Sequence, residues 1–166
     1  MNLKIKSVAG AVTSVMALGL VVAGPASTAQ AEAGGRFYIV NKATGTCLKG
    51  NGNNKDVTLG KCAKADAFHW NTYGPGRYVN YSTGTVEFGG TICISSNGKN
   101  KPVSLRVCKT GIGTGAWRLA SLKNGAHTPF ANSKCGYLQA INDKVTRCGA
   151  RPANKNAMTW VIKYTL

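Results

Sequence analysis

Short runs of alternating apolar and polar residues, separated by turn-forming residues, follow the first segment of this chain. They cover 36–41, 57–59, 77–81, 103–105 and 160–164. A period of two is typical of strands with one buried face. No segment keeps a helical period, so the pattern predicts an all-β chain. We expect the last run to pair with the first and to bring the two ends together.

The strands recur in three copies of one unit, each marked by two cysteines and a tryptophan. The first cysteines repeat at intervals of 46 and 42 residues, and the tryptophans at intervals of 47 and 43. The marker residues are Cys47, Cys62 and Trp70, then Cys93, Cys108 and Trp117, then Cys135, Cys148 and Trp160. Such a period indicates a repeat architecture. We place the units at about 36–76, 77–124 and 125–166, and expect a closed barrel with threefold pseudo-symmetry.

The amino-terminal segment has the layout of a secretory signal peptide. Lys4 and Lys6 precede an apolar run over 8–23, and small residues follow at 31–33. A membrane anchor needs about 20 apolar residues, and this run is shorter and interrupted. We therefore expect 1–33 to be removed, which leaves one secreted domain, 34–166, with no membrane span.

Six cysteines remain after that cleavage, an even number that favours disulfides in an exported chain. If the units fold alike, each bridge closes a loop inside its own unit. The expected pairs are Cys47–Cys62, Cys93–Cys108 and Cys135–Cys148. Each such loop stabilises the folded state by about 3 kcal/mol in the loop-entropy model.

The chain is strongly basic, with 21 Lys and Arg against 5 Asp and Glu and a net charge of +16. A charge of this size attracts polyanions, and it also keeps an exported protein soluble. Basic residues flank the second cysteine of each unit, and symmetry would gather them into a repeated patch for an anionic ligand. Those residues are Lys61, Lys64, Arg106, Lys109, Arg147 and Arg151. The alternative is an ordinary solvated surface.

The Cys-Leu step at 47–48, the apolar-x-Leu-x-x-Cys step at 57–62 and Trp70 have counterparts in the other units. Together they resemble the ricin B-type β-trefoil, the R-type lectin domain, over essentially the whole exported chain. The resemblance implies a β-barrel capped by three hairpins, with one lobe per unit. It also implies that Trp70, Trp117 and Trp160 are core residues.

The sequence departs from the sugar-binding members of that family at each ligand position. They carry an Asp two residues after the first cysteine, where this chain has Lys49, Ser95 and Tyr137. They carry an aromatic two residues before the second cysteine, where it has Gly60, Arg106 and Thr146. Their Asn-Gln pair before the Trp is replaced at 67–68, 114–115 and 157–158. The usual sugar pocket is therefore not expected.

The third unit still offers polar and aromatic side chains to a carbohydrate. These candidates are Tyr137, Gln139, Asn142, Asp143, Asn154 and Asn156. We expect no catalysis and no cofactor, because no carboxylates sit in related positions and the thiols are committed to bridges. His69 and His127 are too few to ligate a metal.

Two classes of function remain open for a secreted, monomeric trefoil. The first is a lectin-like module for carbohydrate or anionic cell-wall polysaccharide with atypical site residues. The second is a protein-recognition trefoil, an inhibitor or an adaptor in a secreted assembly, that has lost sugar binding. Nucleic acid is disfavoured, because the chain carries no motif that reads RNA or DNA.

Overall fold

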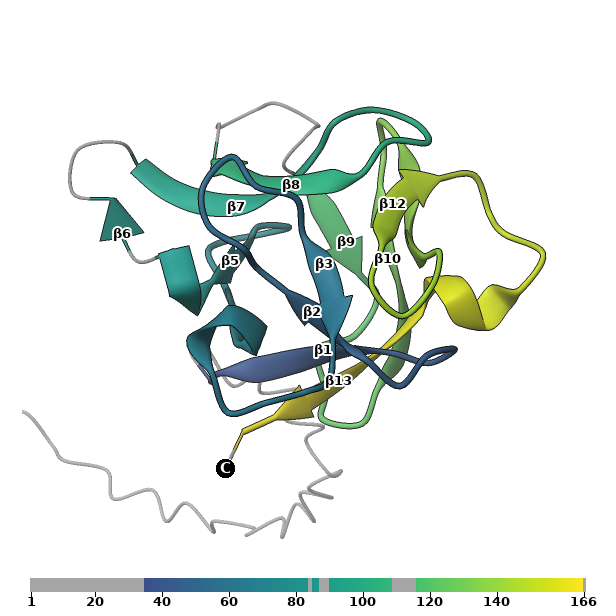
Figure 1. Cartoon of the computed structure of the whole chain (residues 1–166), viewed down its shortest axis with the longest axis horizontal. Helices are drawn as coiled ribbons and strands as arrows, with labels where there is room; N and C mark the ends of the chain where they lie inside the picture. Colours follow the sequence, from purple (N-terminus) through teal and green to yellow (C-terminus); the bar gives the residue numbers. More distant parts are fainter. Residues whose placement is uncertain (1–34, 84, 87–89, 109–115, 166) are drawn as a thin grey trace, which may run out of the picture.

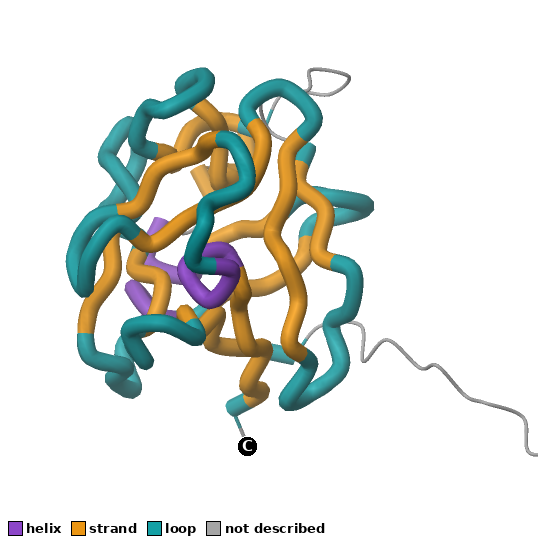
Figure 2. The backbone as a smooth tube through the Cα atoms, turned by 90° about the vertical axis from the view of Figure 1, so that its right-hand side faces the viewer, coloured by secondary structure: helices purple, strands orange, loops and turns teal. Residues whose placement is uncertain are grey.

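The computed structural model describes residues 35–83, 85–86, 90–108 and 116–165. The predicted signal peptide lies outside this range. Within the described residues, no helix has the length and apolar character needed to cross a bilayer. The strands wind around a common core, and loops and short 3-10 helices connect them (Figures 1 and 2). The prediction of an all-β trefoil is confirmed.

Each of the three lobes has a first strand, a central hairpin and a last strand. Lobe 1 contains β1 (Phe37–Asn41), β2 (Cys47–Lys49), β3 (Thr58–Gly60), η1 (Asp66–Phe68) and β4 (Trp70–Thr72). Lobe 2 contains β5 (Tyr78–Asn80), η2 (Tyr81–Thr83), β6 (Thr85–Val86), β7 (Gly90–Ser96), β8 (Val103–Val107) and β9 (Trp117–Leu119). Lobe 3 contains β10 (His127–Asn132), β11 (Gly136–Ala140), β12 (Thr146–Gly149), η3 (Lys155–Met158) and β13 (Thr159–Tyr164).

The first and last strands of the lobes form the barrel. Antiparallel register pairs join β1 to β4, β4 to β5, β9 to β10, β10 to β13 and β13 to β1. Between β5 and β9, the backbone N–H of Trp117 donates to the carbonyl of Gly76 at 2.7 Å. The β1–β13 pairing runs from Phe37 opposite Tyr164 to Asn41 opposite Trp160, so the two ends of the described chain lie side by side (Figure 1).

The hairpins β2–β3, β7–β8 and β11–β12 interlock in a cycle. In each lobe, a lysine carbonyl in the hairpin loop accepts a hydrogen bond from the returning strand of a neighbouring lobe. The three bonds run from Leu105 N to Lys55 O (3.0 Å), from Cys148 N to Lys101 O (3.0 Å) and from Leu59 N to Lys144 O (2.9 Å). The cycle makes Leu59, Leu105 and Cys148 equivalent positions of the three lobes.

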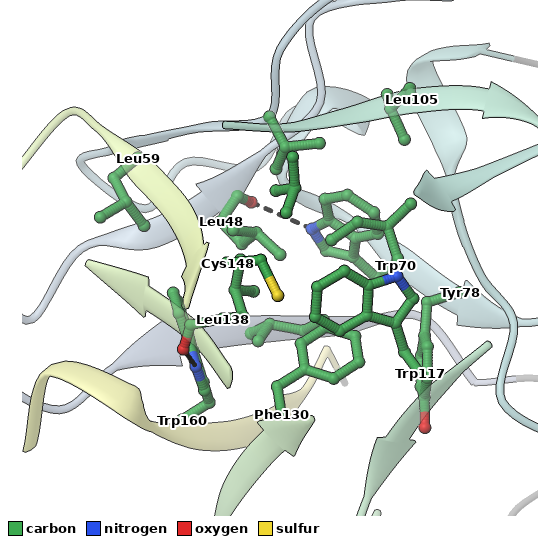
Figure 3. Close-up of a cluster of buried hydrophobic side chains, with 14 of the residues drawn as sticks. Leu48, Leu59, Trp70, Tyr78, Leu105, Trp117, Phe130, Leu138, Cys148 and Trp160 are labelled. Atoms are coloured by element: carbon green, nitrogen blue, oxygen red, sulfur yellow. Dashed lines mark hydrogen bonds between the residues drawn. The ribbon is translucent and has the colours of Figure 1, made fainter. Parts of the chain in front are cut away.

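The three tryptophans are buried, with at most 2% of the residue exposed. The indole Nε1 of Trp70 donates to the carbonyl of Leu48 at 3.0 Å, and that of Trp160 donates to the carbonyl of Leu138 at 3.1 Å (Figure 3). The indole Nε1 of Trp117 has no hydrogen-bond partner among the described residues. Lobe 2 therefore departs from the symmetry of the other two at its tryptophan.

The disulfides join Cys47 to Cys62, Cys93 to Cys108 and Cys135 to Cys148, one within each lobe. The third bridge nevertheless occupies a different place. Leu138 pairs with Cys148, just as Leu48 pairs with Leu59 in lobe 1. Cys47 directly precedes Leu48, whereas Cys135 comes three residues before Leu138. An alignment of lobe 3 on its cysteines is therefore out of register.

Candidate functional site

The strand register corrects two of the sugar-site positions expected in lobe 3. The counterparts of Lys49 and Gly60 are Gln139 and Gly149. The assignment of these two positions to Tyr137 and Thr146 is therefore wrong. Thr146 is buried, and its hydroxyl donates to the backbone carbonyl of Val57 at 2.6 Å. Counting from the cysteines misplaces these positions, because the cysteines of lobe 3 occupy a different register from those of lobe 1.

The protein fills the usual pocket of lobe 1 with its own side chain. Phe68, only 9% exposed, lies over Gly60, where a Cβ would sit 3.3 Å from the ring. The ammonium of Lys49 lies 5.9 Å from the centroid of the same ring. A sugar stacking here would have to displace a buried aromatic side chain.

In lobe 3, the side chains of Asn100 and Gln139 crowd Gly149, the counterpart of Gly60, where a Cβ would lie 2.9 Å from Asn100 Oδ1 and 3.1 Å from Gln139 Nε2. Met158 takes the position of Phe68, two residues before the tryptophan, and is 6% exposed. Gln139 is 4% exposed, and its amide nitrogen donates to the backbone carbonyl of Ala150. In lobe 2, the guanidinium Nε of Arg106 donates to the hydroxyl of Ser104 at 3.0 Å, while 114–115 lie outside the described residues.

The remaining carbohydrate candidates of lobe 3 have separate roles. The amide oxygen of Asn142 accepts from the backbone N–H groups of Lys144 (2.9 Å) and Val145 (2.7 Å), which shapes the β11–β12 loop. Asn154 caps η3, since its side-chain oxygen accepts from the N–H of Asn156 at 3.0 Å. Asp143 and Asn156 are exposed, and Tyr137 is half-buried. Their role in binding a sugar stays a prediction.

Of the basic residues around the second cysteines, Arg106 and Arg147 do not occupy equivalent positions of their lobes, as symmetry was expected to require. Arg106 lies opposite Cys93, whereas Arg147 lies opposite Gln139, and these are different register positions. Lys61, Lys64 and Arg151 are exposed, and Lys109 lies outside the described residues. The shift of the cysteines in lobe 3 again explains the mismatch. Any ligand role of these residues stays a prediction.

A groove of about 610 Å³ opens in the barrel wall beside β5, β9 and β10. Its lining residues are Pro75, Gly76, Tyr78, Ala116, Trp117, Arg118, Leu119, Ala131, Asn132, Ser133, Gly136 and Tyr137. Three of these are aromatic, and Tyr137 is the most accessible of the three. Of the six carbohydrate candidates, Tyr137 is the one that this lining includes.

Glycine at position 76 accounts for the place of the groove. Gly76 bonds to Trp117 where lobe 1 has Phe37 opposite Trp70. It has a φ of +70°, and a Cβ there would lie 2.8 Å from the carbonyl oxygen of Trp117. This backbone conformation and close approach require glycine. Lobe 2 therefore lacks the side chain that fills this position in lobe 1.

Two buried aromatic residues of the groove lining, Tyr78 and Trp117, pack against Phe130. The ring of Phe130 meets Tyr78 edge-on, with centroids 4.8 Å apart, and it lies 5.0 Å from the ring of Trp117. Burial raises the pKa of the Tyr78 hydroxyl, an effect that its hydrogen bond with the backbone of Leu119 partly offsets. Arg118 and Ser133 are exposed and add polar groups.

These features define a β-trefoil whose hairpin pocket is filled in lobe 1 and crowded in lobe 3, and whose barrel wall carries an aromatic groove. Among solved structures, the fold is similar to a designed threefold-symmetric protein, ThreeFoil, with a TM-score of 0.62 and 15% identity over 79% of this chain and 99% of that one. It is also similar to the C-terminal half of an earthworm R-type lectin in complex with GalNAc, with a TM-score of 0.60 and 12% identity over 79% of this chain and 99% of that one.

A third similar structure is a GlcNAcα1-4Gal-releasing endo-β-galactosidase from Clostridium perfringens. Its TM-score is 0.62 at 16% identity, with 80% of this chain and 33% of that chain covered. No protein-family model and no curated protein matches the sequence. At these identities the similarity establishes the β-trefoil fold alone.

Proposed function

We propose that the chain is a secreted, non-enzymatic carbohydrate-binding module, and that the barrel groove is its saccharide site. The observation that carries this proposal is the half-buried ring of Tyr137 in a groove that Tyr78 and Trp117 also line, both packed against Phe130. The fold shared with R-type lectins supports it. Export rests on the signal peptide expected at 1–33.

The groove has the chemistry that a saccharide needs. A sugar ring presents C–H groups that pack on an aromatic face and hydroxyls that need polar partners. Tyr137 offers the face, and the exposed side chains of Arg118 and Ser133 offer a donor and a hydroxyl. The described lining residues include no Asp or Glu, so the groove lacks the paired carboxylates of glycoside hydrolysis.

A glycan array tests this site, with Tyr137→Ala beside the parent protein. We expect the bound glycans to lose about tenfold in affinity, which corresponds to about 1.4 kcal/mol of lost stacking. Tyr81→Ala is the matched control, because Tyr81 is also half-buried but does not line the groove. Equal glycan profiles for Tyr137→Ala and the parent would remove the groove as the site.

Protein recognition is the second candidate. The filling of the usual pocket by Phe68 in lobe 1, and the crowding of Gly149 by Asn100 and Gln139 in lobe 3, favour it. A module that no longer holds sugar in its hairpins can still present its loops to a partner. A pull-down from spent medium separates the two functions, since only protein recognition predicts one defined partner. That partner, together with an empty glycan array, would replace the first proposal.

A further inference from the structure

The hairpin loops carry three lysines at equivalent positions of the three lobes. The carbonyls of Lys55, Lys101 and Lys144 accept the cyclic hydrogen bonds that interlock the hairpins. The pseudo-threefold axis therefore relates the three residues and places them at one level of the molecule. All three are exposed. We name this set the lysine ring.

An asparagine braces each loop of the lysine ring. The side-chain amide of Asn51 donates to the carbonyl of Asp56 at 2.8 Å, and that of Asn97 donates to the carbonyl of Pro102 at 2.8 Å. In lobe 3, the amide oxygen of Asn142 accepts from the two N–H groups after Asp143. The backbones that carry the lysines are thus fixed before a ligand arrives, which lowers the entropy cost of binding.

Among the described residues, no carboxylate forms an ion pair with a lysine of the ring. In the described part of the chain, the ion pairs within 4.0 Å all involve Asp66, which meets Arg36 and His69. Asp56 and Asp143 neighbour two of the lysines in sequence and moderate the local potential, but neither pairs with one. The net charge of +16 adds long-range attraction for an anion.

We propose that the lysine ring binds a linear phosphate polymer. An ammonium is a compact charge that suits the dispersed oxygens of a phosphate group, and three of them around one axis can engage successive phosphates. The inference goes beyond the proposed function, because it gives the domain a second site with its own anionic ligand. This site is separate from the groove, so either one can fail without the other.

Two probes define the ligand class, inorganic polyphosphate and poly(glycerol phosphate), with the affinity measured from low to moderate salt. The test variant is the triple change Lys55→Gln, Lys101→Gln and Lys144→Gln. We expect it to lose at least about tenfold in affinity. The slope of log K against log salt should fall in magnitude by about 2, because the variant makes three fewer phosphate contacts and so releases fewer counterions on binding. If the protein binds polyphosphate but not poly(glycerol phosphate), the ligand is a free phosphate chain. If it binds poly(glycerol phosphate) but not polyphosphate, the ligand is a wall polymer.

The matched control removes three exposed lysines outside these loops, Lys42→Gln, Lys123→Gln and Lys163→Gln. It has the same net charge as the test variant and is expected to stay within about twofold of the parent. Asp56→Asn with Asp143→Asn is expected to tighten binding. Equal losses in both triple variants, no binding at low salt, or stronger binding to heparin or single-stranded DNA would overturn the proposal. Tyr137→Ala is expected to leave phosphate binding unchanged.

Discussion

The backbone N–H of Trp117 donates a 2.7 Å hydrogen bond to the carbonyl of Gly76, where the first and last strands of lobe 2 approach each other. The other neighbouring strands of the barrel share register pairs, up to five between β1 and β13. Among the described residues, β5 and β9 share no register pair, and the bond between Trp117 and Gly76 joins them where the groove opens. The conformation of Gly76 matters both to barrel closure and to the shape of the groove.

Gly76→Ala is expected to destabilise the fold by about 2 kcal/mol. The new Cβ would lie 2.8 Å from the carbonyl oxygen of Trp117, in a backbone with a φ of +70°. Gly74→Ala is the control, because its φ is also +70° but a Cβ there meets no atom within 4 Å. It should cost only about 1 kcal/mol. Denaturant unfolding measures both, and equal losses would show that the close approach to Trp117 costs nothing.

The sequence was sufficient to predict the trefoil, because a period of cysteines and tryptophans survives where other residues vary between the units. It did not give the register of lobe 3, where Cys148 stands at the core position of Leu59 and Leu105. One sign was visible. The third cysteine pair is separated by 13 residues, whereas the other two pairs are separated by 15.

A second missed signal is the segment Asn-x-x-x-Gly, which begins at Asn41, Asn80 and Asn132. These asparagines are buried, and each donates its side-chain amide to a carbonyl of the lobe before it in cyclic order, which for Asn41 is lobe 3. These hydrogen bonds hold neighbouring lobes together. A buried polar side chain needs a hydrogen-bond partner. The sequence does not identify that partner, because it lies in another lobe of the folded chain.

The three lysines of the ring also share a spacing in the sequence. Each lysine comes four residues before the central residue of its returning strand, in the pairs Lys55 and Leu59, Lys101 and Leu105, and Lys144 and Cys148. Alignment on the second cysteines concealed this spacing. The groove could not be predicted at all, because it depends on the contact between Gly76 and Trp117, which are 41 residues apart.

Trp70→Phe and Trp160→Phe are each expected to destabilise the protein by about 1 kcal/mol more than Trp117→Phe does. All three changes remove similar buried volume. The first two also leave the carbonyls of Leu48 and Leu138 without the indole donor, whereas Nε1 of Trp117 has no partner among the described residues. Thermal unfolding of the three variants measures the difference. Equal losses would mean that the indole hydrogen bonds contribute no net stability.

The Cys135–Cys148 disulfide is expected to be the last of the three to open under mild reduction without denaturant. Cys62 is exposed and Cys108 is partly exposed, whereas Cys135 and Cys148 are both buried. A thiolate must reach a sulfur atom to exchange with it, so the Cys135–Cys148 bridge should open last. Alkylation at timed intervals, followed by peptide mass mapping, gives the order. Early labelling of Cys148 would contradict the burial of this bridge.

Stability is expected to fall as the pH rises above about 10, in part because of Tyr78. Burial raises the pKa of this hydroxyl from its ordinary value of 10.0, so the folded protein holds the proton after the unfolded chain has released it. The contribution is therefore fully present below pH 10 and is lost as the pH climbs toward the raised folded value. Tyr78→Phe should make the alkaline loss of stability shallower.

Urea midpoints at neutral and alkaline pH, for the parent protein, Tyr78→Phe and Tyr73→Phe, separate this effect from other alkaline titrations. Tyr73 is 51% exposed and serves as the control. Tyr78→Phe also removes the hydrogen bond with the backbone of Leu119, so its stability should be lower at neutral pH. The informative quantity is the change between the two pH values. If that change is the same in Tyr78→Phe as in the parent, Tyr78 ionises equally in the folded and unfolded chains, and the groove lining around it is more hydrated than its packing implies.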